Sequence, residues 1–170
     1  MKNHYVETDL LKIKHLSSVR EDENYRFRKF LKDKKNEKID RIVRRLHDEL
    51  TLQIDCTLCG NCCCQLKPEL YRDDIAVLAR LENTTPENYQ DCYCEEADFG
   101  EFFLKTIPCR YLVDKKCCIY ENRPEECRSF PYTGKENFIS RLWSMIDLYG
   151  ICPIVFNLME RLKGKLRFRR

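Results

Sequence analysis

The cysteines are the residues of this sequence whose number and spacing could do chemistry. Residues 56–64, CTLCGNCCC, hold five of the twelve cysteines, and none occurs before Cys56 or after Cys152. Thiolates are soft ligands that bind zinc, copper(I) or iron–sulfur clusters. Such a set of cysteines could form a disulfide framework, a redox thiol site or a metal centre, and the rest of the sequence has to discriminate among the three.

The spacing of the first three cysteines is typical of a metal site. Cys56, Cys59 and Cys62 are separated by two residues each, a gap at which neighbouring side chains reach one metal while the backbone turns back on itself. Gly60 lies between them and can adopt the positive φ that such a loop requires. Zinc and a 4Fe–4S cube both take four ligands, so a distant cysteine must complete the site. We predict that this ligand is Cys152, which is followed by proline as in the bacterial ferredoxin pattern.

The remaining cysteines predict a second centre. Cys63 directly follows Cys62, and adjacent side chains point in different directions, so these two fit two centres, or one bridged centre, better than a single ion. Cys109, Cys117 and Cys127 lie in turns rich in proline or aromatic residues. We predict that these three join Cys63 in a second four-cysteine site close to the first.

The residues around these eight candidate ligands have simpler expected roles. Four thiolates on Zn(II) or on an oxidised 4Fe–4S core leave a charge of about −2, which nearby cations can offset. The flanking cations are Arg110, Arg123 and Arg128. Four further cysteines exceed the pattern and are expected to pack or to lie exposed without a metal. They are Cys64, Cys92, Cys94 and Cys118.

The histidines do not indicate a catalytic thiol. A cysteine nucleophile needs one reactive thiol beside an imidazole, whereas here the thiols are clustered and His4, His15 and His47 all precede Cys56. His47 is the nearest to the cysteines, and we expect it to be an ordinary surface or hydrogen-bonded histidine. No catalytic residue is assigned, and enzymatic activity is left open.

Composition places the chain among folded, charge-rich proteins. Its 170 residues are enough for one domain, and 43% of them are hydrophobic and 35% charged. The first residues lack the uninterrupted apolar stretch of a signal peptide, and no segment has the roughly 20 apolar residues of a membrane span. We therefore expect a cytoplasmic protein without a membrane partner, in a reducing compartment where cysteine clusters bind metals instead of forming disulfides.

The charge of the chain bears on its partners. A net charge of +3 is slight for this length, so nucleic-acid binding is not expected. The basic residues within residues 26–35 could offer a face for a protein partner, although a solvated helix surface is the commoner explanation of such a pattern.

Hydrophobic periodicity predicts mainly helices. Apolar residues recur at three- and four-residue steps over residues 37–52, and Trp143 is expected in the apolar core stripe of a helix over residues 137–149. The β-branched and aromatic run over residues 102–120, with a turn at residues 114–116, predicts a small β-hairpin. Further helices are expected at residues 71–82, after Thr85, and at residues 153–162.

These elements predict a mainly α fold with a small β-hairpin, a cysteine-rich single domain organised by metal with an N-terminal helical arm. The basic helical arm covers residues 1–50, and the metal-chelating domain covers residues 51–156. Residues 157–170 are expected to form the end of the C-terminal helix and a frayed basic tail.

The order of these motifs resembles the YkgJ-type cysteine-cluster family, a zinc- or iron-chelating domain marked by the motif C-x-x-C-x-x-C-C. That motif lies at residues 56–63 and is followed by PC-x-x-L at 108–112, C-x-I-Y at 117–120, RP-x-x-CR at 123–128 and FP at 130–131. The resemblance covers about residues 50–156, implies metal or iron–sulfur binding, and leaves the first fifty residues unexplained.

The same cysteine motif occurs in flagellin lysine N-methylases, in which a cluster is tied to methyl transfer. Those enzymes are much longer, and this chain has no Gly-rich nucleotide loop after a strand. Spacing and resemblance together predict a metal-binding protein that chelates a 4Fe–4S iron–sulfur cluster or Zn(II), with iron–sulfur favoured by the ferredoxin-like spacing. The alternatives are a cluster-dependent redox or methyl-transfer enzyme and a zinc-stabilised docking module.

Overall fold

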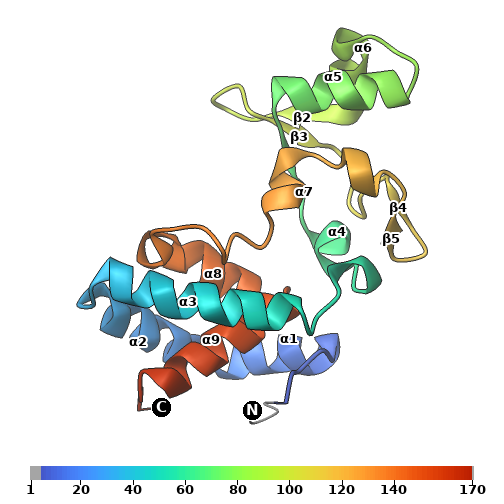
Figure 1. Cartoon of the computed structure of the whole chain (residues 1–170). Coiled ribbons are helices and arrows are strands. Elements are labelled where there is room, and N and C mark those ends of the chain that lie inside the picture. The colour runs from blue at the N-terminus through green and yellow to red at the C-terminus, as the bar shows by residue number, and fades with distance from the viewer. Residues whose placement is uncertain (1–4, 170) are drawn as a thin grey trace. The chain divides into compact units, whose positions relative to one another are not determined.

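The computed structural model describes residues 5–169, in which helices predominate and the strands are short (Figure 1). The predicted fold class, mainly α with a small β-hairpin, is confirmed. By their packing, the described residues form two compact units: unit 1 contains residues 5–55 and 131–169, and unit 2 contains Cys56–Phe130. His4 lies outside the described residues.

The division by packing differs from the division drawn through the cysteines. The sequence-based boundaries at residues 50 and 156 follow where cysteines occur, whereas the packing boundaries fall at Asp55 and Phe130. The physical reason lies in unit 1, where the helix that precedes the first cysteine packs against the last helix of the chain. Residues 1–50 therefore include helices that share a core with the C-terminal segment.

Unit 1 is built from helices. They are α1 (Leu10–Val19), α2 (Glu21–Lys32), α3 (Asn36–Thr51), the 3₁₀ helix η3 (Phe138–Arg141), α8 (Leu142–Tyr149) and α9 (Pro153–Lys165). Helix α9 contacts α1, α3 and α8, and its first seven residues are all buried. Figure 1 shows α9 running between α1 and α3. The core of unit 1 is thus centred on α9.

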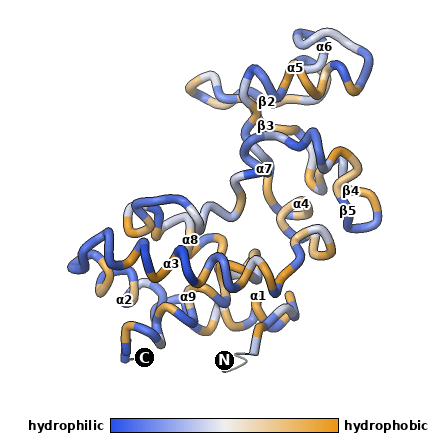
Figure 2. Tube along the Cα trace, viewed as in Figure 1, coloured by the Kyte–Doolittle hydropathy of each residue, from blue (hydrophilic) through white to orange (hydrophobic). Residues whose placement is uncertain are grey.

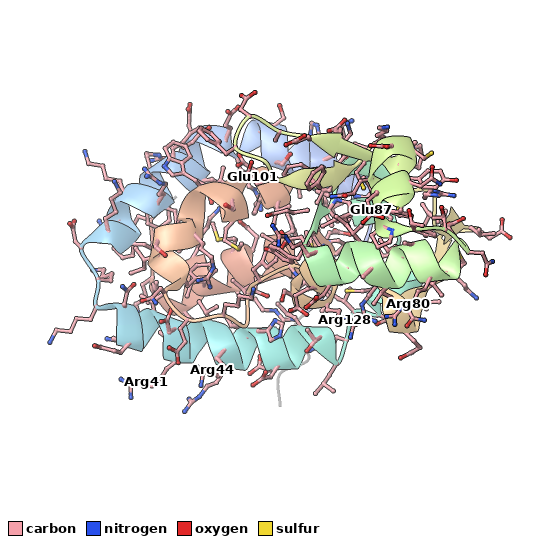
Figure 3. All side chains as sticks on the ribbon, turned by 90° about the horizontal axis from the view of Figure 1, so that it is seen from above. Arg41, Arg44, Arg80, Glu87, Glu101 and Arg128 are labelled. Carbon is pink, nitrogen blue, oxygen red and sulfur yellow. The ribbon has the colours of Figure 1, made fainter. Side chains whose placement is uncertain are left out.

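Helix α3 forms where the apolar period predicts it. Ile39, Val43, Leu46 and Leu50 are buried on one side, which is the spacing of one helical face. Figure 2 shows the resulting alternation of hydrophobic and hydrophilic residues along α3. On the other side, Arg41 and Arg44 are exposed and project outward (Figure 3). Burial of the apolar stripe, more than intrinsic propensity, is what holds such a helix.

Two sequence-based expectations for unit 1 are wrong. Trp143 is 51% exposed and does not belong to the core, because the buried stripe of α8 runs through Leu142 and Met145. The C-terminal tail is not frayed up to residue 168. The ring of Phe168 lies 5.0 Å from that of Phe27 and 5.4 Å from that of Phe30, measured between ring centroids. Aromatic packing therefore anchors the end of the chain on α2.

A buried network of ion pairs and hydrogen bonds links α9 to α2 and α8. Lys163 is 1% exposed, and its Nζ donates hydrogen bonds to Glu23 at 2.8 Å, Asn24 at 2.6 Å and Glu160 at 2.8 Å. The hydroxyl of Tyr149 also donates to Glu160, at 2.8 Å. A buried ammonium group is tolerated only when it is paired and hydrogen-bonded in this way.

Glu160 should make the stability of unit 1 depend on acidity. Burial alone would raise the pKa of Glu160, but Lys163, Tyr149 and Arg20 together hold it below its ordinary value of 4.5. A lowered folded-state pKa adds stability that is present above the ordinary pKa of 4.5, and that stability disappears as the pH falls below 4.5 and through the lowered folded-state pKa. We expect Glu160→Gln to destabilise the protein by about 3 kcal/mol near neutral pH and to flatten this acid dependence, as measured by urea unfolding at several pH values.

The control for this variant is Glu49→Gln. Glu49 is 52% exposed on the side chain and lies 3.7 Å from Arg161. An exposed pair contributes at most about 1 kcal/mol, so its loss should leave the acid dependence unchanged. The same acid dependence in Glu160→Gln as in the parent protein would contradict the assignment.

Unit 2 combines short helices with two small antiparallel sheets. Its helices are η1 (Cys56–Leu58), α4 (Asn61–Gln65), α5 (Arg72–Leu81), α6 (Pro86–Tyr93), η2 (Tyr120–Asn122) and α7 (Glu125–Ser129). Its strands are β1 (Glu69–Leu70), β2 (Cys94–Glu96), β3 (Phe102–Leu104), β4 (Leu112–Val113) and β5 (Lys116–Cys117). The first sheet has the order β1-β3-β2, and the second pairs β4 with β5. Thr85 caps α6 with Pro86 in its first turn, as its sequence predicts.

The predicted hairpin exists but is shorter than the run of β-forming residues. Asp114 and Lys115 have φ of 49° and 64° and turn the chain between β4 and β5, and two consecutive positive φ values are the mark of a type I′ turn. Phe102 to Leu104 instead pair with β1 and β2. The two sheets separate because residues 105–111 leave the extended conformation between them.

The described residues contain no helix that is both long and apolar enough to cross a membrane.

Candidate metal centre

The first cysteine loop is a tight turn followed by a short helix. The N–H of Cys59 donates to the carbonyl of Cys56 at 3.2 Å, which closes the 3₁₀ turn η1. Gly60 then has a φ of 61° and precedes α4. The positive φ that the cysteine spacing predicts at Gly60 is therefore confirmed, and it lets the chain change direction between Cys59 and Cys62.

The same glycine allows the first loop to lie against the hairpin that carries Cys117. A β-carbon at Gly60 would come within 2.6 Å of the backbone carbonyl oxygen of Lys115, in the β4–β5 turn. Helix η1 also contacts β5. Residues 56–60 and Cys117 are thereby neighbours within unit 2, although nearly sixty residues separate them in sequence.

Gly60→Ala is expected to destabilise unit 2 by more than about 2 kcal/mol. The left-handed conformation alone disfavours alanine by roughly 1–2 kcal/mol, and the close carbonyl of Lys115 belongs to the backbone, which cannot simply rotate away. Urea unfolding and metal content measure the effect. Gly164→Ala in α9 is the matched control, because its β-carbon would meet nothing within 4 Å. That substitution should stabilise the helix slightly, and an equal loss in both variants would contradict the argument.

Three consecutive cysteines occupy helix α4. Cys62, Cys63 and Cys64 are each half-buried, and on a helix successive side chains are turned by about 100°. The sulfur atoms of Cys62 and Cys63 lie 4.0 Å apart. The hydrogen bond from the Cys62 thiol lowers the pKa of Cys63 to about 7. Cys63 is thus well suited to be a thiolate, the form that binds metals.

Backbone contacts hold two downstream cysteines near Cys63. The N–H of Cys109 donates to the carbonyl of Cys63 at 2.7 Å, and the N–H of Leu112 donates to the carbonyl of Cys109 at 3.0 Å. Leu112 in turn pairs with Cys117 across the β4–β5 hairpin. A short chain of backbone contacts therefore links all three cysteines.

The third downstream cysteine is held by helix α7. Cys127 lies in this helix, and Asp74 accepts a hydrogen bond from the N–H of Glu125 at its start, at 3.0 Å. The second oxygen of Asp74 accepts from the N–H of Tyr71, also at 3.0 Å. One carboxylate thus caps α5 and fixes the beginning of α7.

Charge interactions between these thiols agree with the placement given by the backbone contacts. Burial raises the pKa of Cys109, Cys117 and Cys127, in the last case to about 12, and the negative charge of Cys63 adds to the rise in all three. Cys127 also feels Cys109 and Cys117. We call Cys63, Cys109, Cys117 and Cys127 the Cys63 group.

The chemistry of the Cys63 group fits a thiophilic metal. Four sulfur donors are the set that zinc or a 4Fe–4S cluster takes. Burial and mutual repulsion disfavour thiolates at Cys109, Cys117 and Cys127, and a bound cation would relieve both effects. Among residues 5–169, however, no group of three or more His, Cys, Asp or Glu side chains stands arranged to hold a metal ion. Metal binding at this group would therefore include closure of the side chains around the metal.

Comparison with known proteins adds to this geometry. The family model CxxCxxCC, described as "Putative zinc- or iron-chelating domain", matches residues 55–144. The chain belongs to the CxxCxxCC family. The matched segment contains all of unit 2, so the resemblance inferred from the cysteine motifs is confirmed. Neither the curated proteins nor the solved structures give a match to this chain.

Seven of the eight cysteines expected to bind metal in this CxxCxxCC protein belong to unit 2. The eighth, Cys152, belongs to unit 1, where it is 5% exposed and precedes the first turn of α9. Its N–H donates to the carbonyl of Leu148 at 2.8 Å. The ligand set Cys56, Cys59, Cys62 and Cys152 stays a prediction from sequence spacing.

The cysteines that exceed the CxxCxxCC pattern differ in their surroundings. Cys94 is buried in the apolar core of unit 2, whereas Cys92 and Cys118 are exposed. The thiol of Cys92 donates to the side chain of Asn88 at 3.7 Å. Cys64 remains half-buried in α4, beside the candidate ligands.

The flanking arginines are not equivalent. The charge of Arg123 acts on the thiol of Cys117. Arg128, labelled in Figure 3, donates to the backbone carbonyls of Arg123 at 2.8 Å and Glu121 at 3.2 Å, which braces the turn before Cys127. Arg110 pairs with Glu82 at 3.1 Å. Arg123 is therefore the arginine whose charge reaches a candidate ligand, and Arg128 supports the loop.

His47 is a hydrogen-bonded histidine of unit 1. Its Nδ1 lies 2.8 Å from the hydroxyl of Thr133, and its ring lies against Gly134. This contact agrees with the ordinary role that the sequence indicates for His47.

Two supporting features have no counterpart in sequence reasoning. The hydroxyl groups of Tyr89 and Tyr111 lie 2.9 Å apart in the core of unit 2, against which Cys109 and Cys117 pack. The carbonyl of Lys115 that faces Gly60 is the second. Both depend on contacts between distant segments. The one sequence signal that could have indicated the tyrosine pair is the aromatic Tyr111 within the PC-x-x-L string.

Proposed function

We propose that this CxxCxxCC protein is a metal-binding protein with two thiolate centres, each an iron–sulfur cluster or Zn(II). The family assignment supports zinc or iron chelation as the general function. The observation that carries the second centre is the Cys63 group, in which backbone contacts bring the loop of Cys109 and the strand of Cys117 towards Cys63 in α4. The charge interactions with Cys127 in α7 agree with this grouping. Its four members are a full ligand set for one centre.

The first centre takes Cys56, Cys59 and Cys62, with Cys152 as the fourth ligand suggested by its sequence context. The sulfurs of Cys62 and Cys63 lie 4.0 Å apart, so the two proposed centres would be close neighbours or share a bridge. Both centres need deprotonated thiols, so metal binding releases protons and favours the folded ligand loops. The cysteine content fits a reducing compartment such as the cytoplasm.

The residues of this chain would contribute specific electrostatic support. Arg123 lies where its positive charge acts on Cys117, and it offsets part of the negative charge of four thiolates. Cys127 is half-buried, so the second centre would be partly screened from water on the side of α7. The role we propose for the bound metal is to hold the loops of unit 2 together.

Metal analysis tests this proposal. The intact protein is purified without oxygen, and its iron, zinc and acid-labile sulfide are measured per chain together with the visible spectrum. We expect two metal centres per chain, and iron–sulfur clusters would give brown absorption near roughly 400 nm. A colourless protein with two zinc ions would select Zn(II), and a metal-free folded protein would overturn the proposal.

A matched pair of variants adds a control. Cys59→Ala removes a predicted ligand, and Cys92→Ala removes an exposed cysteine of the same unit. The first variant should lose metal and folded structure together, because metal binding free energy is folding free energy at such sites. The second should retain both, and a fully loaded Cys59→Ala protein would contradict the assigned ligands.

A further inference from the structure

An aromatic surface with cations lies on α2 and α8 of unit 1. Trp143, the single tryptophan of the chain, is 51% exposed, and Tyr25 is 40% exposed. Their rings meet edge to face with centroids 5.6 Å apart. The guanidinium carbon of Arg28 lies 3.9 Å from the centroid of the Trp143 ring. Two large rings thus stay accessible to solvent beneath a cation.

The cationic side chains continue along the same face of α2. Tyr25, Arg28, Lys29 and Lys32 follow the helical steps of three, four and seven residues, so they share one side of the helix. Lys29 and Lys32 are exposed. We call these four residues together with Trp143 the Trp143 surface.

Helix electrostatics explain only part of this arrangement. Lysines in the last turn of a helix complement its dipole, which accounts for Lys29 and Lys32. It does not account for Trp143, whose large apolar ring would gain more from burial than from water. An aromatic residue that carries a cation over its ring and is left half-exposed is instead typical of the anchor of a binding surface.

We propose that the Trp143 surface docks an acidic peptide segment that carries an aromatic side chain, on a protein partner. Carboxylates of such a segment complement Arg28, Lys29 and Lys32, and its ring packs on Trp143 and Tyr25. This inference does not depend on the metal centres, because no residue of the surface is among the proposed ligands.

The charges around the surface favour a peptide over a nucleic acid. Glu21 and Asp22 precede Tyr25 on α2, and Asp147 follows Trp143 by one turn of α8; all three are exposed. A nucleic acid presents a continuous row of phosphates, which these acids would repel, and its affinity grows with the number of phosphates that cations neutralise. A short acidic segment needs only the three cations of the surface, Arg28, Lys29 and Lys32.

Trp143 provides its own readout, because no other tryptophan contributes to the emission. The intact protein is titrated with the synthetic peptide Asp-Glu-Glu-Phe-Glu-Asp-Glu while Trp143 fluorescence is followed. We expect a saturable change that weakens as salt is raised, since the pairing charges are exposed. The same peptide with lysine in place of every acid should give no saturable change.

Charge variants locate the binding. Anisotropy of the labelled peptide is measured for Arg28→Glu, for the double variant Lys29→Glu with Lys32→Glu, and for Arg41→Glu as the control on the outer side of α3 (Figure 3). Both test variants should weaken binding about tenfold or more, and the control less than about twofold. The double variant keeps the test valid if Arg28→Glu unfolds, which circular dichroism would reveal.

Three results would overturn the proposal. The first is an equal effect of Arg41→Glu and the test variants. The second is tighter binding of a ten-thymidine oligonucleotide than of the acidic peptide, which would assign the surface to nucleic acid. The third is a change of Trp143 emission with protein concentration alone, which would make a second copy of the chain the occupant.

Discussion

Cys63→Ala is expected to remove one of the two proposed metal centres, whereas Cys64→Ala is expected to remove neither. The two cysteines are neighbours in α4 and both are half-buried, so they are closely matched for helix propensity and burial. The negative charge of Cys63 acts on Cys109, Cys117 and Cys127, the three cysteines that complete its proposed ligand set. Loss of one thiolate leaves three, too few for a closed four-ligand site.

The measurement is metal per chain after anaerobic purification, with the urea midpoint of each variant. Cys63→Ala should retain about half of the metal, and its unfolding free energy should fall by several kcal/mol, because structural zinc sites contribute roughly 10–16 kcal/mol of binding free energy. Complete loss of metal would instead indicate one bridged centre. Equal metal in Cys63→Ala and Cys64→Ala would contradict the assignment of the second centre.

Metal removal should unfold unit 2 and leave unit 1 folded. The buried core of unit 2 is small: Leu70, Ile75, Leu78, Ala79, Tyr89, Cys94, Leu104 and Tyr111. Units of this size usually need a metal or disulfides to be stable. Unit 1 contains no member of the Cys63 group and is held by the packing of α9 against α1, α3 and α8.

Hydrogen exchange of the intact chain, before and after a metal chelator, separates the two units. We expect protection to be lost across residues 56–130 and to be kept in α3 and α9, and restored in unit 2 when the metal is added back. The far-UV helical signal should therefore fall only in part. Uniform loss of protection in both units, or no loss in unit 2, would contradict the proposed role of the metal.

Most of the helices could be predicted from the sequence, because their signals are local. The buried residues of α3 recur at the helical period, and Thr85 with Pro86 marks the start of α6. The turn at Asp114 and Lys115 also agrees with the prediction. The pairing of β1 with β3 in the first sheet could not be predicted from local signals, because more than thirty residues separate these two strands in the chain.

Trp143 shows where local patterns fail. Its neighbours Leu142 and Met145 are buried, so the periodicity of this segment is consistent with more than one choice of apolar face. The side that α8 turns towards α9 decides which residues are buried, and this depends on the packing of helices from both ends of the chain.

The sequence by itself determined three features of this protein: cysteines at a spacing typical of metal sites, a glycine where the loop needs a positive φ, and membership of a family described as zinc- or iron-chelating. These signals are local or motif-like, so they need no fold. The sequence also predicted that Cys109, Cys117 and Cys127 join Cys63, but only the tertiary structure shows the backbone contacts that bring Cys109 and Cys117 towards Cys63. Only the tertiary structure decided that Gly60 faces the carbonyl of Lys115 and that Trp143 is exposed. The contact of Gly60 with Lys115 and the exposure of Trp143 depend on the packing of segments far apart in the chain, which local sequence patterns do not fix.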